Sequence, residues 1–177
     1  MPAASRAVRR NRSVAPSYQR SLPWLLLSQV YWMSYKLLER RFYHLGVSAS
    51  QARVLLVLYD AGAPVKPSLV AALLFQETQS ITGILHRIES RGWVRRHPDR
   101  NDRRAVGLEL TEKGRRVSEQ IIDVSDRLYA ELFSSAMSAT ERRQLEAILR
   151  KVRRRAFRLP ETDFKLRRAQ EYAMWAD

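Results

Sequence analysis

Residues 78–114 constrain the fold most, because their hydrophobic period changes from that of a helix to that of a strand. Over residues 78–91, large apolar side chains recur three and four positions apart and so share one helical face. They are Ile81, Ile84, Leu85 and Ile88. Gly92 then ends the predicted helix after a basic last turn. Over residues 106–110, the apolar residues Val106, Leu108 and Leu110 alternate with Gly107 and Glu109, which predicts a β-strand.

A partner strand over residues 93–97 precedes this one, and the loop between them is rich in turn-forming residues and arginines. The loop reads Pro98, Asp99, Arg100, Asn101, Asp102, Arg103 and Arg104. A helix followed by a hairpin with a basic tip is typical of a winged helix-turn-helix. The sequence thus predicts a mainly α fold with a small β-hairpin wing.

The face of the 78–91 helix opposite its apolar residues is short, polar and capable of hydrogen bonding. It comprises Thr78, Gln79, Ser80, Thr82, Gly83, His86 and Arg87. A helix exposed only for solubility favours Glu/Lys pairs, whereas these groups suit base edges and phosphates. The face therefore predicts contact with nucleic acid. The simpler alternative is that helix and hairpin only pack onto a core, with solvated charges outside.

The charge of the chain agrees with a nucleic-acid partner. Its 32 Lys+Arg against 18 Asp+Glu give a net charge of +14, which favours nucleic acid over a membrane surface. No apolar run approaches the roughly 18 residues that a membrane span needs. Cysteine is absent, which excludes disulfides, cysteine-ligated zinc and thiol redox sensing.

Catalytic signatures are missing from the sequence. His44, His86 and His97 do not have the spacing of metal ligands, and there is no glycine-rich phosphate loop or nucleophile motif. We therefore expect a protein that is not an enzyme and that needs neither a metal nor another cofactor.

The segments before residue 78 follow winged-helix order. A long helix is expected over residues 22–44, and Gly46 ends it. Ser48 and Gln51 form a capping box that starts a helix reaching Tyr59. A third helix begins with Pro67 at its first position and runs to about residue 75.

Two further helices follow the wing. Thr111 is a natural N-cap for the first, whose apolar stripe includes Val117, Ile121, Val124, Leu128 and Leu132. Ser138 and Glu141 form a capping box for the second, predicted over residues 138–156. A single stripe cannot bury itself. Either these helices fold back on the first helix of the same chain, or, as we favour, they form a dimer interface with it.

The predicted domain organisation has five parts. They are a disordered basic arm (1–20), a dimerisation helix (21–45), the winged DNA-binding domain (46–112), dimerisation helices (113–158) and a C-terminal extension (159–177). The arm holds five arginines and no acid, so it is disordered, an extra phosphate-binding arm, or both. Such an N-terminus is also typical of a transit peptide.

Residues 48–114 resemble the MarR family of transcription regulators. The resemblance rests on Ser80-Ile81-Thr82, on Arg91-Gly92-Trp93-Val94-Arg95-Arg96, on Asp99-Arg-Asn-Asp102-Arg103-Arg104 and on Leu110-Thr111-Glu112-Lys113-Gly114. It implies a homodimeric repressor that binds a pseudo-palindromic operator in double-stranded DNA, in the cytoplasm of a bacterium or archaeon and on its nucleoid when bound. A module for protein or RNA contact is the alternative.

The resemblance also implies roles for particular residues. The polar face of the 78–91 helix would enter the groove, and the wing (Arg100, Asn101, Asp102, Arg103 and Arg104) would contact DNA, with Arg103 and Arg104 reaching phosphates or the minor groove. Gly83 departs from the family, in which a larger, often basic residue is common.

Many members of this family bind small aromatic or lipophilic anions in a cleft between the DNA-binding head and the dimer region. A candidate pocket for such an effector here is Trp24, Tyr31 and Tyr35 against Leu55, Leu58 and Tyr59. Packed core is the alternative role for these side chains.

Overall fold

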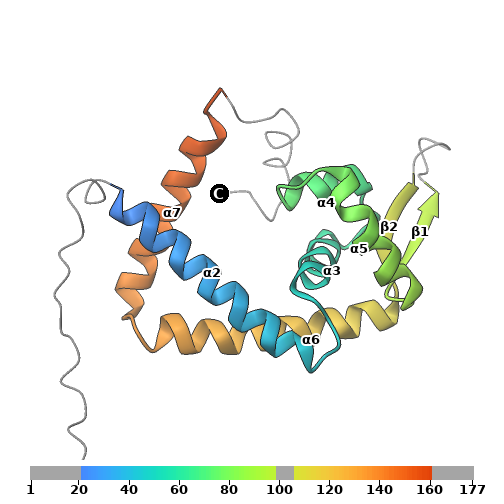
Figure 1. Cartoon of the computed structure of the whole chain (residues 1–177), viewed down its shortest axis with the longest axis horizontal. Coiled ribbons are helices and arrows are strands. Elements are labelled where there is room, and N and C mark those ends of the chain that lie inside the picture. The colour runs from blue at the N-terminus through green and yellow to red at the C-terminus, as the bar shows by residue number, and fades with distance from the viewer. Residues whose placement is uncertain (1–20, 99–105, 161–177) are drawn as a thin grey trace, which may run out of the picture. The chain divides into compact units, whose positions relative to one another are not determined.

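The computed structural model describes residues 21–98 and 106–160 (Figure 1). The chain divides into two units, residues 1–36 and 37–177, and the boundary falls within helix α2 (Leu22–Tyr43). The described part is mostly helical with one two-stranded antiparallel sheet, which confirms the predicted fold class.

Three helices and a hairpin form the head of the second unit (Figure 1). They are α3 (Ala49–Ala61), α4 (Pro67–Leu73), α5 (Thr78–Ser90), β1 (Val94–Pro98) and β2 (Val106–Leu110). Helix α3 packs against α4, α5 and β2, and α5 also contacts α4 and β1. The capping box before α3 is confirmed: the Gln51 amide N–H donates to Ser48 Oγ at 3.2 Å, and the Ser48 N–H to Gln51 Oε1 at 2.9 Å.

The core of the head comes from every one of these elements. Val54, Leu55, Val70, Ile81, Ile88 and Leu108 are almost completely buried. The four apolar residues predicted to share a face of α5 are all buried, which confirms that face. The position of α5 in the head is therefore fixed by hydrophobic burial.

The hairpin pairs Val94 with Leu110 and Pro98 with Val106. Val65, just before α4, adds an isolated bridge to Leu108, so the base of the hairpin is joined to the helices. Gly107 is needed at this join, because a Cβ there would lie 2.7 Å from Pro64 Cβ. The residues between the strands, 99–105, lie outside the described part of the chain.

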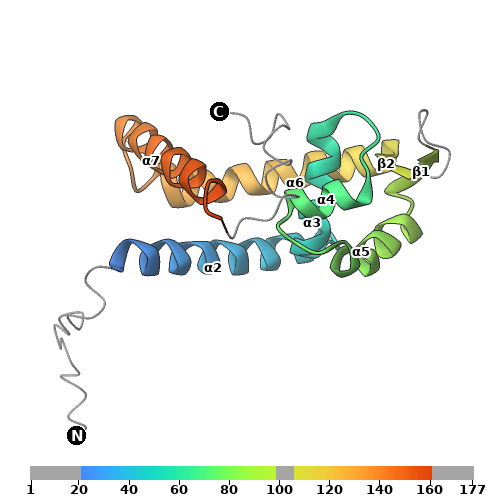
Figure 2. The ribbon, with the colours of Figure 1, turned by 90° about the horizontal axis from the view of Figure 1, so that it is seen from above.

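Helix α6 (Glu112–Tyr129) leads away from the hairpin, continues into a short π-helical turn, η1 (Ala130–Ser134), and is followed by α7 (Ala139–Phe157) (Figure 2). The capping box before α7 is confirmed by the Ser138 N–H, which donates to Glu141 Oε2 at 2.8 Å. Arg41 Nη1 donates to Glu131 Oε1 at 3.1 Å and so ties the end of α2 to η1.

The apolar stripe of α6 is only partly buried within the chain, because Val117, Val124 and Leu132 are half-buried, and its place at a dimer interface stays a prediction. Ile121 is completely buried and Leu128 nearly so, and α6 packs against α3. The spacing correctly predicted an apolar face, but a helix pattern alone does not say which surface covers that face. Unpaired apolar side chains occur on α7, where Ile148 and Val152 are 58% and 55% exposed.

The first unit contains the N-terminal part of α2. Its large apolar residues are exposed around the helix rather than along one face; they are Trp24, Leu26, Leu27, Val30, Tyr31, Trp32 and Met33. The Tyr31 ring lies 5.3 Å from that of Trp32 and 6.3 Å from that of Tyr35, measured between centroids. None of the helices within the described residues is long and apolar enough to cross a membrane.

Candidate nucleic-acid interface

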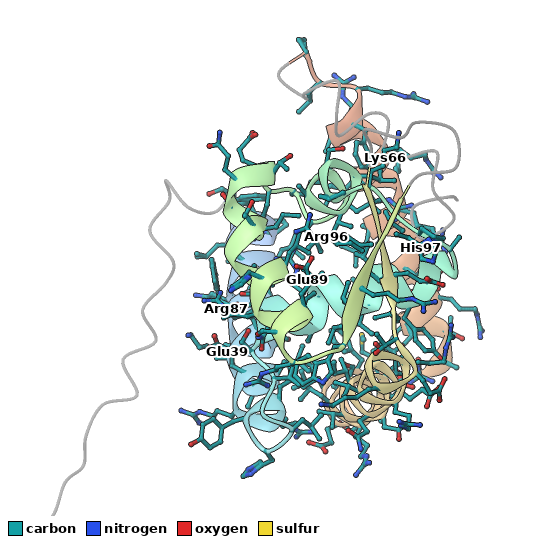
Figure 3. The ribbon with its side chains drawn as sticks, turned by 90° about the vertical axis from the view of Figure 1, so that its right-hand side faces the viewer. Glu39, Lys66, Arg87, Glu89, Arg96 and His97 are labelled. Atoms are coloured by element: carbon teal, nitrogen blue, oxygen red, sulfur yellow. The ribbon has the colours of Figure 1, made fainter. Side chains whose placement is uncertain are left out.

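The side of α5 that faces away from the core presents a row of exposed residues. Gln79, Gly83, His86 and Ser90 follow one another at helical spacings of four, three and four, and all four are exposed. Ser80, Thr82 and Arg87 flank this row and are exposed as well. Arg87 projects from the outer side of α5 (Figure 3). The structure thus brings together the polar face predicted from sequence.

Two threonines of that face have more local roles. Thr78 is half-buried, and the Thr82 hydroxyl donates to the Thr78 carbonyl at 3.1 Å. Ser90 was not among the predicted contact residues, although it lies seven positions after Gly83 and thus on the same side. The Ser90 hydroxyl donates to the Arg87 carbonyl at 2.9 Å.

The turn between α4 and α5 is contacted by side chains of two other helices, α3 and α7. Arg53 of α3 donates from Nη2 to the Leu74 carbonyl at 2.9 Å, which satisfies a backbone group at the end of α4. Phe75 has a positive φ of 56°, and its ring stacks on Phe157, at the end of α7, with 6.4 Å between centroids. The start of α5 is therefore positioned by α3 and α7 as well as by its own buried face.

Ion pairs fix the wing strands. Arg96 of β1 places Nε 2.9 Å from Glu89 Oε1, and in Figure 3 these two side chains lie between α5 and the hairpin. Arg95 Nη2 lies 3.0 Å from Glu109 Oε2, and His97 Nε2 lies 3.6 Å from the same oxygen. Sequence analysis did not identify the Glu89–Arg96 pair, because it joins a helix to a strand across a turn. Arg100, Asn101, Asp102, Arg103 and Arg104 lie outside the described residues.

Two of the stretches that carried the family resemblance, residues 91–96 and 110–114, meet at one corner. The Thr111 hydroxyl donates to the Gly92 carbonyl at 2.6 Å and accepts from the Gly114 N–H at 3.1 Å. A Cβ on Gly114 would lie 1.9 Å from the Trp93 carbonyl oxygen, so only glycine fits. The motif therefore specifies how the wing joins α5 and α6.

Arg91 and Lys113 strengthen the same corner. The Arg91 guanidinium donates to the Gly46 carbonyl and lies 4.7 Å from the centre of the Trp93 ring, a cation–π contact. Lys113 Nζ donates to the Arg91 carbonyl at 3.0 Å. The corner thereby holds the end of α5, the start of the wing and the loop after α2 together.

The predicted pocket residues occupy different surroundings. Leu55 and Leu58 are buried in the core of the head. Tyr59 is half-buried, with the Arg115 guanidinium 5.6 Å from its ring centre. Trp24, Tyr31 and Tyr35 belong to the first unit, in which Trp24 is 71% exposed. A joint pocket formed by these six residues stays a prediction.

Comparisons with known proteins agree with this geometry. Residues 45–105 match the MarR family. The chain is 34% identical over 124 residues to the transcriptional repressor MprA of Escherichia coli (strain K12), covering 68% of this chain and 70% of that protein. It is 33% identical over 118 residues to the multiple antibiotic resistance protein MarR of the same organism. This match covers 66% of this chain and 81% of that protein.

A solved structure supports the fold. The C80S mutant of MarR from E. coli, complexed with operator DNA, is 30% identical and has a TM-score of 0.67, covering 76% of this chain and 96% of that chain. An exposed polar helix beside a basic hairpin defines the class as a winged helix-turn-helix, DNA-binding transcription regulator. Within that class, this chain belongs to the MarR family, whose members are transcription regulators rather than enzymes.

Proposed function

We propose that this protein is a homodimeric repressor that binds a pseudo-palindromic operator in double-stranded DNA. The observation that carries the proposal is the exposed row of α5, held outward by four buried residues of the same helix. The major groove of B-DNA admits an α-helix, and its base edges present distinguishable donors and acceptors. The relative MprA, named as a transcriptional repressor, and the operator complex of MarR support this role.

Within this proposal, recognition and general affinity come from different elements. Gln79 is exposed at the first turn of α5, and its amide offers a donor and an acceptor for a bidentate contact to adenine. Arg103 and Arg104, which come between β1 and β2 in the sequence, are assigned to phosphates or a narrow minor groove. The net charge of +14 favours such contacts irrespective of sequence.

Exposed apolar surface supports dimerisation. On α7, Ile148 and Leu149 lie four and three positions before Val152, and the three side chains are 58%, 39% and 55% exposed. The aromatic and aliphatic residues of the first unit are exposed around α2. A helix that is apolar all round belongs in a buried setting, and a second copy of this chain would supply one. Two heads related by a two-fold axis would read a pseudo-palindrome.

A small aromatic compound is our proposed effector. The rings of Trp24, Tyr31 and Tyr35, predicted from sequence to line a pocket, offer aromatic surface on which such a ligand can stack in place of part of the dimer contact. Binding of such a ligand beside the dimer region would shift the spacing of the two heads and so release the operator.

Selection from a randomised duplex library with the purified wild-type protein tests the main proposal. We expect an enriched inverted repeat, footprinted on both halves by one dimer, with affinity that falls steeply as salt rises. Failure to enrich any duplex, or tighter binding to single-stranded RNA of random sequence measured in parallel, would contradict the proposal.

A further inference from the structure

Gly83 lies in the middle of the exposed row of α5, and there is open space where its side chain would be. It follows Gln79 by four residues and precedes His86 by three. A Cβ built on Gly83 would meet nothing within 4 Å. The result is a notch in the row, with longer polar side chains on either side.

The other five glycines of the chain have local reasons to be glycine. Gly46, Gly62 and Gly92 have positive φ angles of 60° to 68°, which other residues adopt with strain. A Cβ on Gly107 or Gly114 would clash with neighbouring atoms. Gly83 has neither a positive φ nor a close neighbour.

Within the described residues of the head, no backbone angle and no close neighbour requires glycine at position 83. A glycine inside a helix is less stable than alanine, so the absent side chain carries a cost within the chain itself. Its advantage arises only when another molecule approaches this face. On the proposed function, on which this step rests, that molecule is duplex DNA.

The chemistry of the notch indicates which part of the DNA enters it. The amide N–H and carbonyl of Gly83 lie in the interior of α5, where such groups serve the helix, so the notch offers Cα hydrogens rather than free hydrogen-bonding groups. A polar base edge placed there would go unpaired. The one apolar group that projects into the major groove is the C5 methyl of thymine.

We propose that the Gly83 notch receives a thymine methyl group in each half-site, which makes Gly83 a specificity-determining residue. Gln79 and His86 would then contact the base pairs on either side. A side chain at position 83 would hold α5 away from the groove floor and weaken those contacts.

The test compares wild type with Gly83→Ala on the duplex selected by the wild-type protein. Alanine should raise Tm by about 2–4 °C, because it favours the helix. It should nevertheless weaken binding to the selected duplex about tenfold, because the added methyl meets the thymine methyl. A scrambled duplex of equal composition should bind both proteins alike, since no particular base enters the notch there.

Uracil lacks the C5 methyl and so isolates the contact. Each thymine of the selected site is replaced in turn, symmetrically in both halves. At one position, uracil should abolish the difference in duplex affinity between wild type and Gly83→Ala. Operator binding by Gly83→Ala that is as tight as that of wild type, or tighter, would overturn the inference. So would a weaker affinity of Gly83→Ala that persists when uracil replaces thymine at every position in turn. Failure of the wild type to select any duplex would instead overturn the proposed function.

Discussion

Glu89 of α5 and Arg96 of β1 form an ion pair in which Glu89 Oε1 lies 2.9 Å from Arg96 Nε. Glu89 is largely shielded and Arg96 is about half exposed. The pair spans the turn at Gly92 and links the helix proposed to enter the major groove to the wing. The pair is therefore one link between the two elements proposed to contact DNA.

Removing this link should affect DNA binding more than folding. We expect Glu89→Gln to lower the free energy of unfolding by no more than about 1 kcal/mol, because the pair is partly exposed. Operator affinity should fall because one of the links between the wing and the helix is lost. A double-mutant cycle with Arg96→Gln should give a coupling energy for DNA binding of about 0.5–1 kcal/mol. Strictly additive effects would show that the pair does not act as a unit.

The exposed residues of α7 allow a test of dimerisation. Ile148→Asp should produce monomers, because it would bury an unpaired charge at the proposed interface. Ala147→Asp introduces the same charge at an exposed position on another side of the helix and should leave the dimer intact. Light scattering at micromolar concentration measures the oligomeric state of wild type and of both variants. A monomeric wild type, or equal effects of the two variants, would contradict the assignment of this surface.

Gly114 provides a test of the corner between the wing and α6. Gly114→Ala should destabilise the protein by about 3 kcal/mol, since the new Cβ would lie far too close to the Trp93 carbonyl. Gly83→Ala is the matched control and should be stabilising. Urea denaturation of the two variants compares them directly; similar midpoints would mean that the corner relaxes without cost.

The Arg41–Glu131 pair predicts part of the pH dependence of stability. Hydrogen bonds from Arg41 lower the pKa of Glu131 below its ordinary value of 4.5. A carboxyl with a lowered folded-state pKa stabilises the fold above that ordinary value and loses its contribution as the pH falls through the folded value. Glu131→Gln should therefore reduce the urea midpoint at pH 7, and its difference from wild type should shrink as the pH is lowered below 4.5. Glu119→Gln, at an exposed position of α6, is the control.

Much of the head could be predicted from sequence because its signals are local. The Ser48 capping box, the glycine after α5 and the buried face of α5 each follow from neighbouring residues, as does the Ser138 capping box outside the head. The exposed row could be predicted for the same reason, since it lies opposite that buried face.

Contacts between distant segments could not be predicted in this way. The amino-acid sequence does not show that Ile121 is covered by the chain's own head, that Arg53 reaches Leu74, or that Phe157 stacks on Phe75. Each depends on how separate helices cross, which the spacing within one helix does not determine.

Salt titrations of binding separate the assigned roles of recognition helix and wing. Arg104→Ala should weaken binding to operator and scrambled duplex alike and reduce the salt slope by about one, because it removes one phosphate contact. Arg127→Ala, which removes an exposed arginine of α6, serves as the matched charge control and should leave the slope unchanged. An unchanged slope for Arg104→Ala would place the wing tip away from phosphates.

The most direct test of the central claim is the affinity of Gln79→Ala for the selected operator and for a scrambled duplex. Gln79 is exposed on α5, and its amide is assigned to a base edge. We expect Gln79→Ala to lose about 1–3 kcal/mol of binding free energy on the operator and almost none on the scrambled duplex. Equal losses on both duplexes, or no loss on either, would contradict the claim that this face of α5 reads the DNA sequence.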